Sequence, residues 1–156
     1  MRESKGVLTR STLAVLLFSF LYLQLSFSCS SAYRNIKIQL QATTDCNKGN
    51  PIIIRIHQLQ SDATFKTITI ESYIRNPDEA FGKDQLEKPL EKTVYPDSVL
   101  KLDDLKISKE AHFIAVVADF YEFEGDQWRL LEPAATFGKR PIIIACQGKR
   151  IVLLKQ

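Results

Sequence analysis

PIIIRIHQL, the stretch Pro51–Leu59, is the part of the sequence that decides the fold class. Successive side chains of a strand point to opposite faces, so Ile52, Ile54 and Ile56 share one apolar face of an extended chain. The opposite face is mixed and consists of Ile53, Arg55, His57 and Leu59. We therefore predict a strand with one face in a core and the other face partly covered by another segment.

Similar short strands are predicted on both sides of this one. Before it, Asn35–Gln41 alternates between apolar and polar residues, which is typical of a half-buried strand. After it, turn signals such as Pro96-Asp97 and Gln147-Gly148-Lys149 separate further apolar or alternating runs. These runs are Leu90–Tyr95, Ser98–Asp103, Ala111–Tyr121, Gln127–Leu131, Pro141–Cys146 and Arg150–Leu154.

The segment 61–86 interrupts the β pattern. A cap at Ser61 or Asp62 favours a helix, as do Phe65, Ile68 and Ser72, which fall at helical spacing. The β-branched residues of Thr67–Ile70 leave a strand open as an alternative for TITIESYI. About eight short strands with one helical interruption predict a mainly β fold, a β-sandwich with an excursion on one side.

Residues 1–28 have the features of a secretory signal peptide. Arg2, Lys5 and Arg10 precede Thr12–Phe27, an uncharged stretch of 16 residues. A membrane-spanning helix needs about 20 apolar residues, so this stretch is short for one and fits a signal peptide better. An uncleaved N-terminal anchor is the alternative.

Cys29 follows this apolar stretch directly after Ser28, as in the lipobox of bacterial lipoproteins, where the cysteine is acylated and begins the mature chain. We therefore predict a lipoprotein signal peptide over 1–28, a tether over 29–34 and a single β-sandwich domain over 35–156. Ser30 after the cysteine favours sorting to the outer membrane. Ordinary cleavage after Ser28 or Ala32, without lipidation, is the competing interpretation.

The composition excludes several classes of protein. With 45% hydrophobic residues, 25% charged residues, 6 glycines and 6 prolines, the 156-residue chain is neither disordered nor collagen-like. Without residues 1–28 the chain keeps 18 of its 21 basic and 17 of its 18 acidic residues, a net charge of about +1. Such a balance gives no clustered basic face for nucleic acid.

The sequence contains no recognisable catalytic or metal-binding motif. His57 and His112 each lie in an apolar run without a second ligand at suitable spacing. The acidic segment Glu122–Asp126 lacks calcium-loop spacing and is interpreted as a solvated turn, and Trp128 is expected to pack in the core or at an edge. We therefore predict that the protein is not an enzyme and uses no cofactor, metal or small-molecule substrate.

Cys46 and Cys146 remain as a pair once Cys29 is lipidated. In an oxidising compartment they can form a disulfide, which would close a loop of about 100 residues. Cys46 follows the opening strand and Cys146 ends the penultimate one, so pairing requires these two strands to lie close together. Two separate free thiols are the alternative.

Several stretches, taken in order, resemble the TssJ (SciN) outer-membrane lipoproteins of the bacterial type VI secretion system. Pro51–Leu59 is similar to the family's P-V-V-V-R-I-Y-Q-L-like strand, which follows a lipidated cysteine, a first strand and a variable loop. The segment 116–120, VVADF, and the pair Trp128-Arg129 are similar to the family's V-V-A-x-F core and its Trp-Arg pair. Further pieces match at Ser61 with Phe65, at Phe81–Leu86 and at Pro96-Asp97, so the resemblance covers nearly all of the mature chain.

The resemblance implies a transthyretin-like β-sandwich with a short helical insertion, lipid-anchored on the periplasmic face of the outer membrane. It also implies a structural role, in which the protein anchors the trans-envelope complex by binding the periplasmic C-terminal domain of TssM. The loop between the first two strands contributes to that contact in the family. By position this loop comprises Thr43, Thr44, Asp45, Asn47, Lys48, Gly49 and Asn50, around Cys46.

Because the loop is polar, we expect its side chains to matter for partner binding and not for the stability of the fold. Alanines at Asn47 and Lys48 should weaken TssM binding and change stability little, whereas Glu122–Asp126 should lie on another face. The loop residues could instead simply form a turn. The alternative function is that of a periplasmic ligand-binding or cell-wall-associated β-sandwich lipoprotein with another partner.

Overall fold

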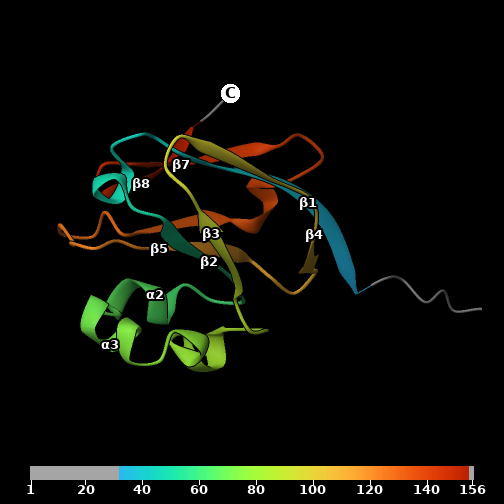
Figure 1. Cartoon of the computed structure of the whole chain (residues 1–156). Coiled ribbons are helices and arrows are strands. Elements are labelled where there is room, and N and C mark those ends of the chain that lie inside the picture. Colours follow the sequence, from blue (N-terminus) through green and yellow to red (C-terminus); the bar gives the residue numbers. More distant parts are fainter. Residues whose placement is uncertain (1–31, 155–156) are drawn as a thin grey trace, which may run out of the picture. The chain divides into compact units, whose positions relative to one another are not determined.

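Eight strands form two four-stranded sheets in the computed structural model, which describes residues 32–154 (Figure 1). The strands are β1 (Tyr33–Ala42), β2 (Ile52–Leu59), β3 (Leu90–Val94), β4 (Ser98–Ser108), β5 (Phe113–Asp119), β6 (Arg129–Pro133), β7 (Ile142–Gln147) and β8 (Arg150–Leu154). One sheet has the order β4-β1-β7-β8 and the other the order β3-β2-β5-β6. The predicted mainly β sandwich is therefore confirmed, and each predicted strand is present.

The core lies between the sheets because the alternating apolar faces of the strands point toward each other. Ile36, Ile38 and Leu40 of β1 are at most 1% exposed, and Ile52, Ile54 and Ile56 of β2 are at most 3% exposed. Full burial of one such side chain stabilises the fold by about 1.5–3 kcal/mol.

Strand β1 is central to its sheet and joins distant parts of the chain. It pairs antiparallel with β4 and parallel with β7, where Ala42 lies opposite Cys146. It begins at Tyr33, earlier than the predicted Asn35, and β4 continues to Ser108, beyond the predicted Asp103. The first and penultimate strands therefore lie side by side, as the proposed cysteine pair requires.

The segment between β2 and β3 is helical, and the strand alternative for TITIESYI is wrong. It contains α2 (Ala63–Thr67) and α3 (Ile70–Arg75). Thr69 begins α3 as a side-chain cap, because its hydroxyl oxygen accepts a hydrogen bond from the Ser72 N–H at 3.3 Å. Short 3₁₀ turns lie at Cys46–Gly49, Pro77–Glu79, Gly82–Asp84 and Ala134–Thr136. Figure 1 shows α2 and α3 on the side of β2 and β5 that faces away from the other sheet.

His57 is the polar residue that this insertion covers. Its side chain is 0% exposed, and its Nδ1 and Nε2 lie 2.9 Å from Gln85 Oε1 and from the Tyr73 hydroxyl, respectively. Gln85 donates through its Nε2 to the Asp78 carbonyl, so its Oε1 faces His57 as an acceptor. His57 therefore donates from Nδ1 and accepts at Nε2. Burial lowers the pKa of His57 to about 4, so the imidazole is neutral at pH 7.

Arg129 connects the insertion to β6. Its Nη1 donates to the carbonyls of Phe65 and Ile68, which lie at the end of α2, and the distance to Ile68 O is 3.0 Å. The guanidinium also lies 4.9 Å from the centre of the Phe65 ring. The neighbouring Trp128 is 2% exposed, which confirms its predicted packing role. The Trp-Arg pair thus holds the helical insertion against the sandwich.

Candidate functional site

Three connections meet at one end of the sandwich, which we call the loop end. It consists of the β1–β2 loop (43–51), the β5–β6 connection (120–128) and the β7–β8 turn (148–149). Figure 1 shows the cyan β1–β2 loop, the orange β5–β6 connection and the red β7–β8 turn at the same end. Hydrogen bonds and ion pairs join all three, so the predicted loop is one part of a larger surface.

The backbone of the β1–β2 loop adopts an unusual conformation. Asn47, Lys48 and Gly49 have φ angles of 51°, 57° and 77°, so three consecutive residues lie in the left-handed region. This conformation costs about 1–2 kcal/mol for each residue with a Cβ, less for asparagine, and it persists only where surrounding contacts hold it. The loop is therefore specified by its surroundings and is not a freely solvated turn.

Asn47 supplies the main contacts that hold this conformation. Its Nδ2 donates to the Pro51 carbonyl at 2.8 Å, and its Oδ1 accepts from the Tyr121 N–H at 2.6 Å. Its own N–H donates to the Gly148 carbonyl at 2.8 Å. Asn47 is only 6% exposed, which corrects the expectation of an exposed turn residue whose replacement leaves the fold nearly unchanged. It joins the three connections and cannot offer its side chain to a partner.

Glu122 pairs with two lysines from the other connections. Lys48 contacts Glu122 Oε1, and Lys149 Nζ lies 2.7 Å from Glu122 Oε2. Hydrogen bonds from Lys149 and then Lys48 lower the pKa of Glu122 to about 2. The acidic segment 122–126 therefore does not lie on another face, because Glu122 belongs to the loop end itself. The three side chains are between 40% and 50% exposed, so they remain accessible to a partner.

Tyr121 and the outer residues of the β1–β2 loop complete the exposed surface. The Tyr121 side chain is 78% exposed, although its backbone N–H is held by Asn47. Thr44, Lys48, Gly49 and Asn50 are exposed as predicted. Asp45 is also exposed, and a hydrogen bond from Thr43 lowers its pKa. Tyrosine is one of the residues that are enriched at the energetic hot spots of protein–protein interfaces.

The two predicted partners of a disulfide lie together beneath this surface. Cys46 and Cys146 are each 0% exposed, and the backbone brings the loop against β7, because the Thr43 N–H donates to the Cys146 carbonyl at 3.0 Å. The interaction between the two thiols lowers the pKa of Cys46 and raises that of Cys146. Both are present as thiols in this structure. Cys29, the predicted lipidation site, lies outside the described residues.

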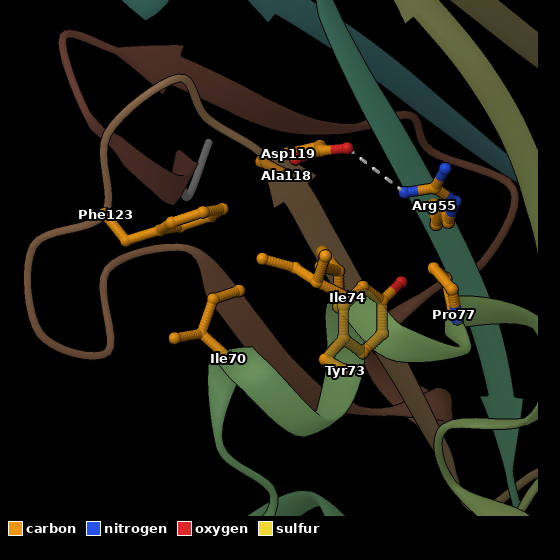
Figure 2. Close-up of a pocket in the computed structure, with 9 residues that line it drawn as sticks. Arg55, Ile70, Tyr73, Ile74, Pro77, Ala118, Asp119 and Phe123 are labelled. Atoms are coloured by element: carbon orange, nitrogen blue, oxygen red, sulfur yellow. Dashed lines mark ion pairs between the residues drawn. The ribbon is translucent and has the colours of Figure 1, made fainter.

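A small pocket adjoins the loop end (Figure 2). It has a volume of about 150 Å³ and lies between α3, which contributes Ile70 and Ile74, and Phe123 of the β5–β6 connection. Figure 2 shows the ion pair of Arg55 with Asp119 at its edge, with an Nη1–Oδ2 distance of 3.6 Å. Sites for drug-sized ligands have volumes of about 300–1,000 Å³. The pocket is therefore suited to a single side chain.

Among the described residues 32–154, no group of three or more potential ligands is placed to hold a metal ion. None of the helices in this part of the chain has the length and apolar character that a membrane crossing requires.

Comparison with known proteins gives one family and several solved structures. The family model described as "Type VI secretion lipoprotein, VasD, EvfM, TssJ" matches residues 34–149. No curated protein matches the sequence. The lipoprotein TssJ1 from Pseudomonas aeruginosa is 18% identical with a TM-score of 0.65, and the match covers 78% of this chain and 95% of that one. Serratia marcescens Lip, a membrane-bound component of the type VI secretion system, is 19% identical with a TM-score of 0.64 over 78% and 97%.

A further match is a chain in a structure described as "Type VI membrane complex", at 18% identity and a TM-score of 0.71 over 78% of this chain and 98% of that one. These likenesses establish the fold, and the family model establishes the relationship. Because that model matches residues 34–149, well over half of the 156 residues, this chain belongs to the type VI secretion lipoprotein family that includes TssJ.

Proposed function

We propose that the protein is a non-enzymatic outer-membrane lipoprotein that anchors the type VI trans-envelope complex by binding the periplasmic C-terminal domain of TssM through the loop end. The observation that carries this proposal is the course of β1, which runs from Tyr33, next to the predicted lipid anchor, to Ala42, where the β1–β2 loop begins. Anchor and loop end would therefore lie at opposite ends of one strand.

The distances fit a protein that presents a rigid surface away from a membrane. If Cys29 carries the lipid, residues 29–32 remain before β1, and they span at most about 14 Å when fully extended. Strand β1 has 10 residues, which corresponds to about 30 Å at 3.3–3.4 Å per residue. A tether of this length would keep the domain near the membrane, and β1 is long enough to separate its first residue from the loop end by about 30 Å.

The comparisons support the choice of partner. Members of this family are structural lipoproteins of a secretion system. A chain in the structure described as "T6SS protein TssM C-terminal domain (869-1107) from EAEC" matches this fold at 19% identity and a TM-score of 0.66, over 78% of this chain and 98% of that one. The rigid, exposed surface of Lys48, Tyr121, Glu122 and Lys149 offers this chain a means of making such a contact.

The test is a binding titration of the detergent-solubilised full chain against immobilised TssM C-terminal domain. Lys48→Ala and Tyr121→Ala each remove an exposed group of the loop end, and each should weaken binding at least tenfold, which corresponds to about 1.4 kcal/mol. Lys101→Ala, at an exposed position of β4, is the matched control and should bind like the wild type. If all three variants bind alike, the loop end is not the contact, and if the wild type does not bind TssM at all, the proposed partner is wrong.

A further inference from the structure

We propose that Cys46 and Cys146 are joined by a disulfide in the protein in the cell, and that this bond fixes the β1–β2 loop to β7 in its left-handed conformation. The proposal rests on the periplasmic location in the proposed function, because disulfides persist in oxidising compartments. It does not depend on the identity of the partner.

The backbone places the two cysteines against each other. Ala42 lies opposite Cys146 in the parallel ladder of β1 and β7. The next residue, Thr43, donates to the Cys146 carbonyl from its N–H at 3.0 Å. The Cys46 N–H then donates to the Thr43 carbonyl at 3.0 Å, which turns the chain back over β7. The backbone hydrogen bonds of Thr43 and Cys46 therefore place Cys46 over β7, near Cys146.

The side chains agree with this placement. Both are 0% exposed and belong to the same core cluster. No third thiol lies among the described residues, so within this part of the chain neither cysteine has a competing partner.

The oxidation is a thiol–disulfide exchange with an oxidised dithiol protein. The Cys46 thiolate attacks one sulfur of the oxidant's disulfide, and the other oxidant sulfur leaves as a thiolate. The Cys146 thiolate then attacks the Cys46 sulfur of the mixed disulfide and releases the second oxidant thiolate. The two cysteines lose two electrons and two protons, and the oxidant gains two electrons as a dithiol. Because the folded sites are buried, the exchange takes place before the loop closes over β7.

The bond would oppose opening of the loop end. The loop is held by hydrogen bonds of Asn47 across to Gly148 and Tyr121, and its left-handed backbone favours opening. A covalent link one residue before Asn47 keeps these donors and acceptors close when a hydrogen bond breaks. The Tyr121 and Asn47 amides should therefore exchange with solvent at least tenfold more slowly in the oxidised protein than in the reduced protein.

The experiment uses the full chain, extracted with detergent from the envelope of a Gram-negative host and denatured with N-ethylmaleimide in the absence of reductant. Trypsin cleaves after Lys37, Lys48, Lys139 and Lys149 but not between Arg140 and Pro141, so the expected product is Ile38–Lys48 linked to Arg140–Lys149. The linked pair should lack two hydrogens relative to the two free peptides and should disappear on reduction. In the Cys46→Ser control, Cys146 should be labelled, which shows that the reagent reaches it in the denatured chain.

A second measurement separates failure of this proposal from failure of the proposed function. The reduced full chain is refolded in detergent with oxidised glutathione and digested in the same way. If both cysteines are labelled in the envelope protein and no linked peptide forms on refolding, the disulfide is refuted on geometry, whatever TssM binding shows. If the link forms on refolding but not in the cell, the native disulfide is refuted and the periplasmic location fails with it. If the link is present but amide exchange at Asn47 and Tyr121 is equal in both forms, the bond does not fix the loop.

Discussion

Replacement of Asn47 by alanine should destabilise the fold by about 3 kcal/mol, although the residue lies in a polar surface loop. The change removes two side-chain hydrogen bonds, those to the Pro51 carbonyl and from the Tyr121 N–H, at a net cost of about 1 kcal/mol each. It also places alanine at a φ of 51°, which adds about 1 kcal/mol because asparagine tolerates this region better. A typical domain has a stability of about 5–15 kcal/mol, so the loss is a large fraction of the total.

Two further variants separate the cost of the lost hydrogen bonds from the cost of the backbone conformation. Asn47→Gly loses the same hydrogen bonds but accepts the positive φ, so it should be less destabilising than Asn47→Ala. Lys48→Ala keeps the backbone conformation and loses only an exposed ion pair, so it should change stability by less than about 1 kcal/mol.

Urea unfolding followed by tryptophan fluorescence measures all three, since Trp128 is buried in the folded state. If Asn47→Ala unfolds within about 0.5 kcal/mol of the wild type, the loop does not depend on Asn47 and the reasoning is refuted. If Lys48→Ala lost as much free energy of unfolding as Asn47→Ala, the reasoning would also be refuted, because any change in the loop would then have the same effect.

The remaining predictions concern pH, redox state, charge and the membrane. The folded pKa of His57 is lowered to about 4 from 6.5, so about 3 kcal/mol of the free energy of unfolding is present above pH 6.5 and is lost as the pH falls to 4. Urea titrations at pH 6.5 and pH 4 should show a smaller loss of stability in His57→Gln than in the wild type, and equal losses would contradict the assignment. Reduction of the Cys46–Cys146 disulfide should lower the free energy of unfolding by up to about 4–5 kcal/mol in the same titration, whereas a protein that is unaffected by reductant has no such bond. Lys48→Glu should reverse a charge beside Glu122 and weaken TssM capture more than Lys48→Ala does, and a tighter complex would show that the partner surface is basic. Cys29→Ser should move the protein from the membrane pellet to the soluble fraction, and retention in the pellet would show an anchor other than the lipid.

Much of the fold could be predicted from the sequence because the signals are local. Strict alternation in Asn35–Gln41 and Pro51–Leu59 reports which face of a strand is apolar, and turn residues mark where each strand ends. The mixed outer face of Pro51–Leu59 even predicted that another segment covers it, as the insertion does over His57. The strand alternative for TITIESYI failed because β-branched propensity is weak against a capped helix that buries Tyr73 on the sheet.

The candidate site was only partly predictable for a different reason. The sequence by itself determined that the loop 43–50 is polar, follows a strand and contains turn-forming residues. Only the tertiary structure decided that Asn47 is buried, that Glu122 lies beside Lys48 and Lys149, and that the loop with Cys46 is hydrogen-bonded to β7 at Cys146. Asn47 and Lys48 lie 74 residues before the partners Tyr121 and Glu122, and these contacts depend on the parallel pairing of β1 with β7 and on the packing of one sheet against the other. Local periodicity reports the faces of a strand, but it carries no information on which strands become neighbours.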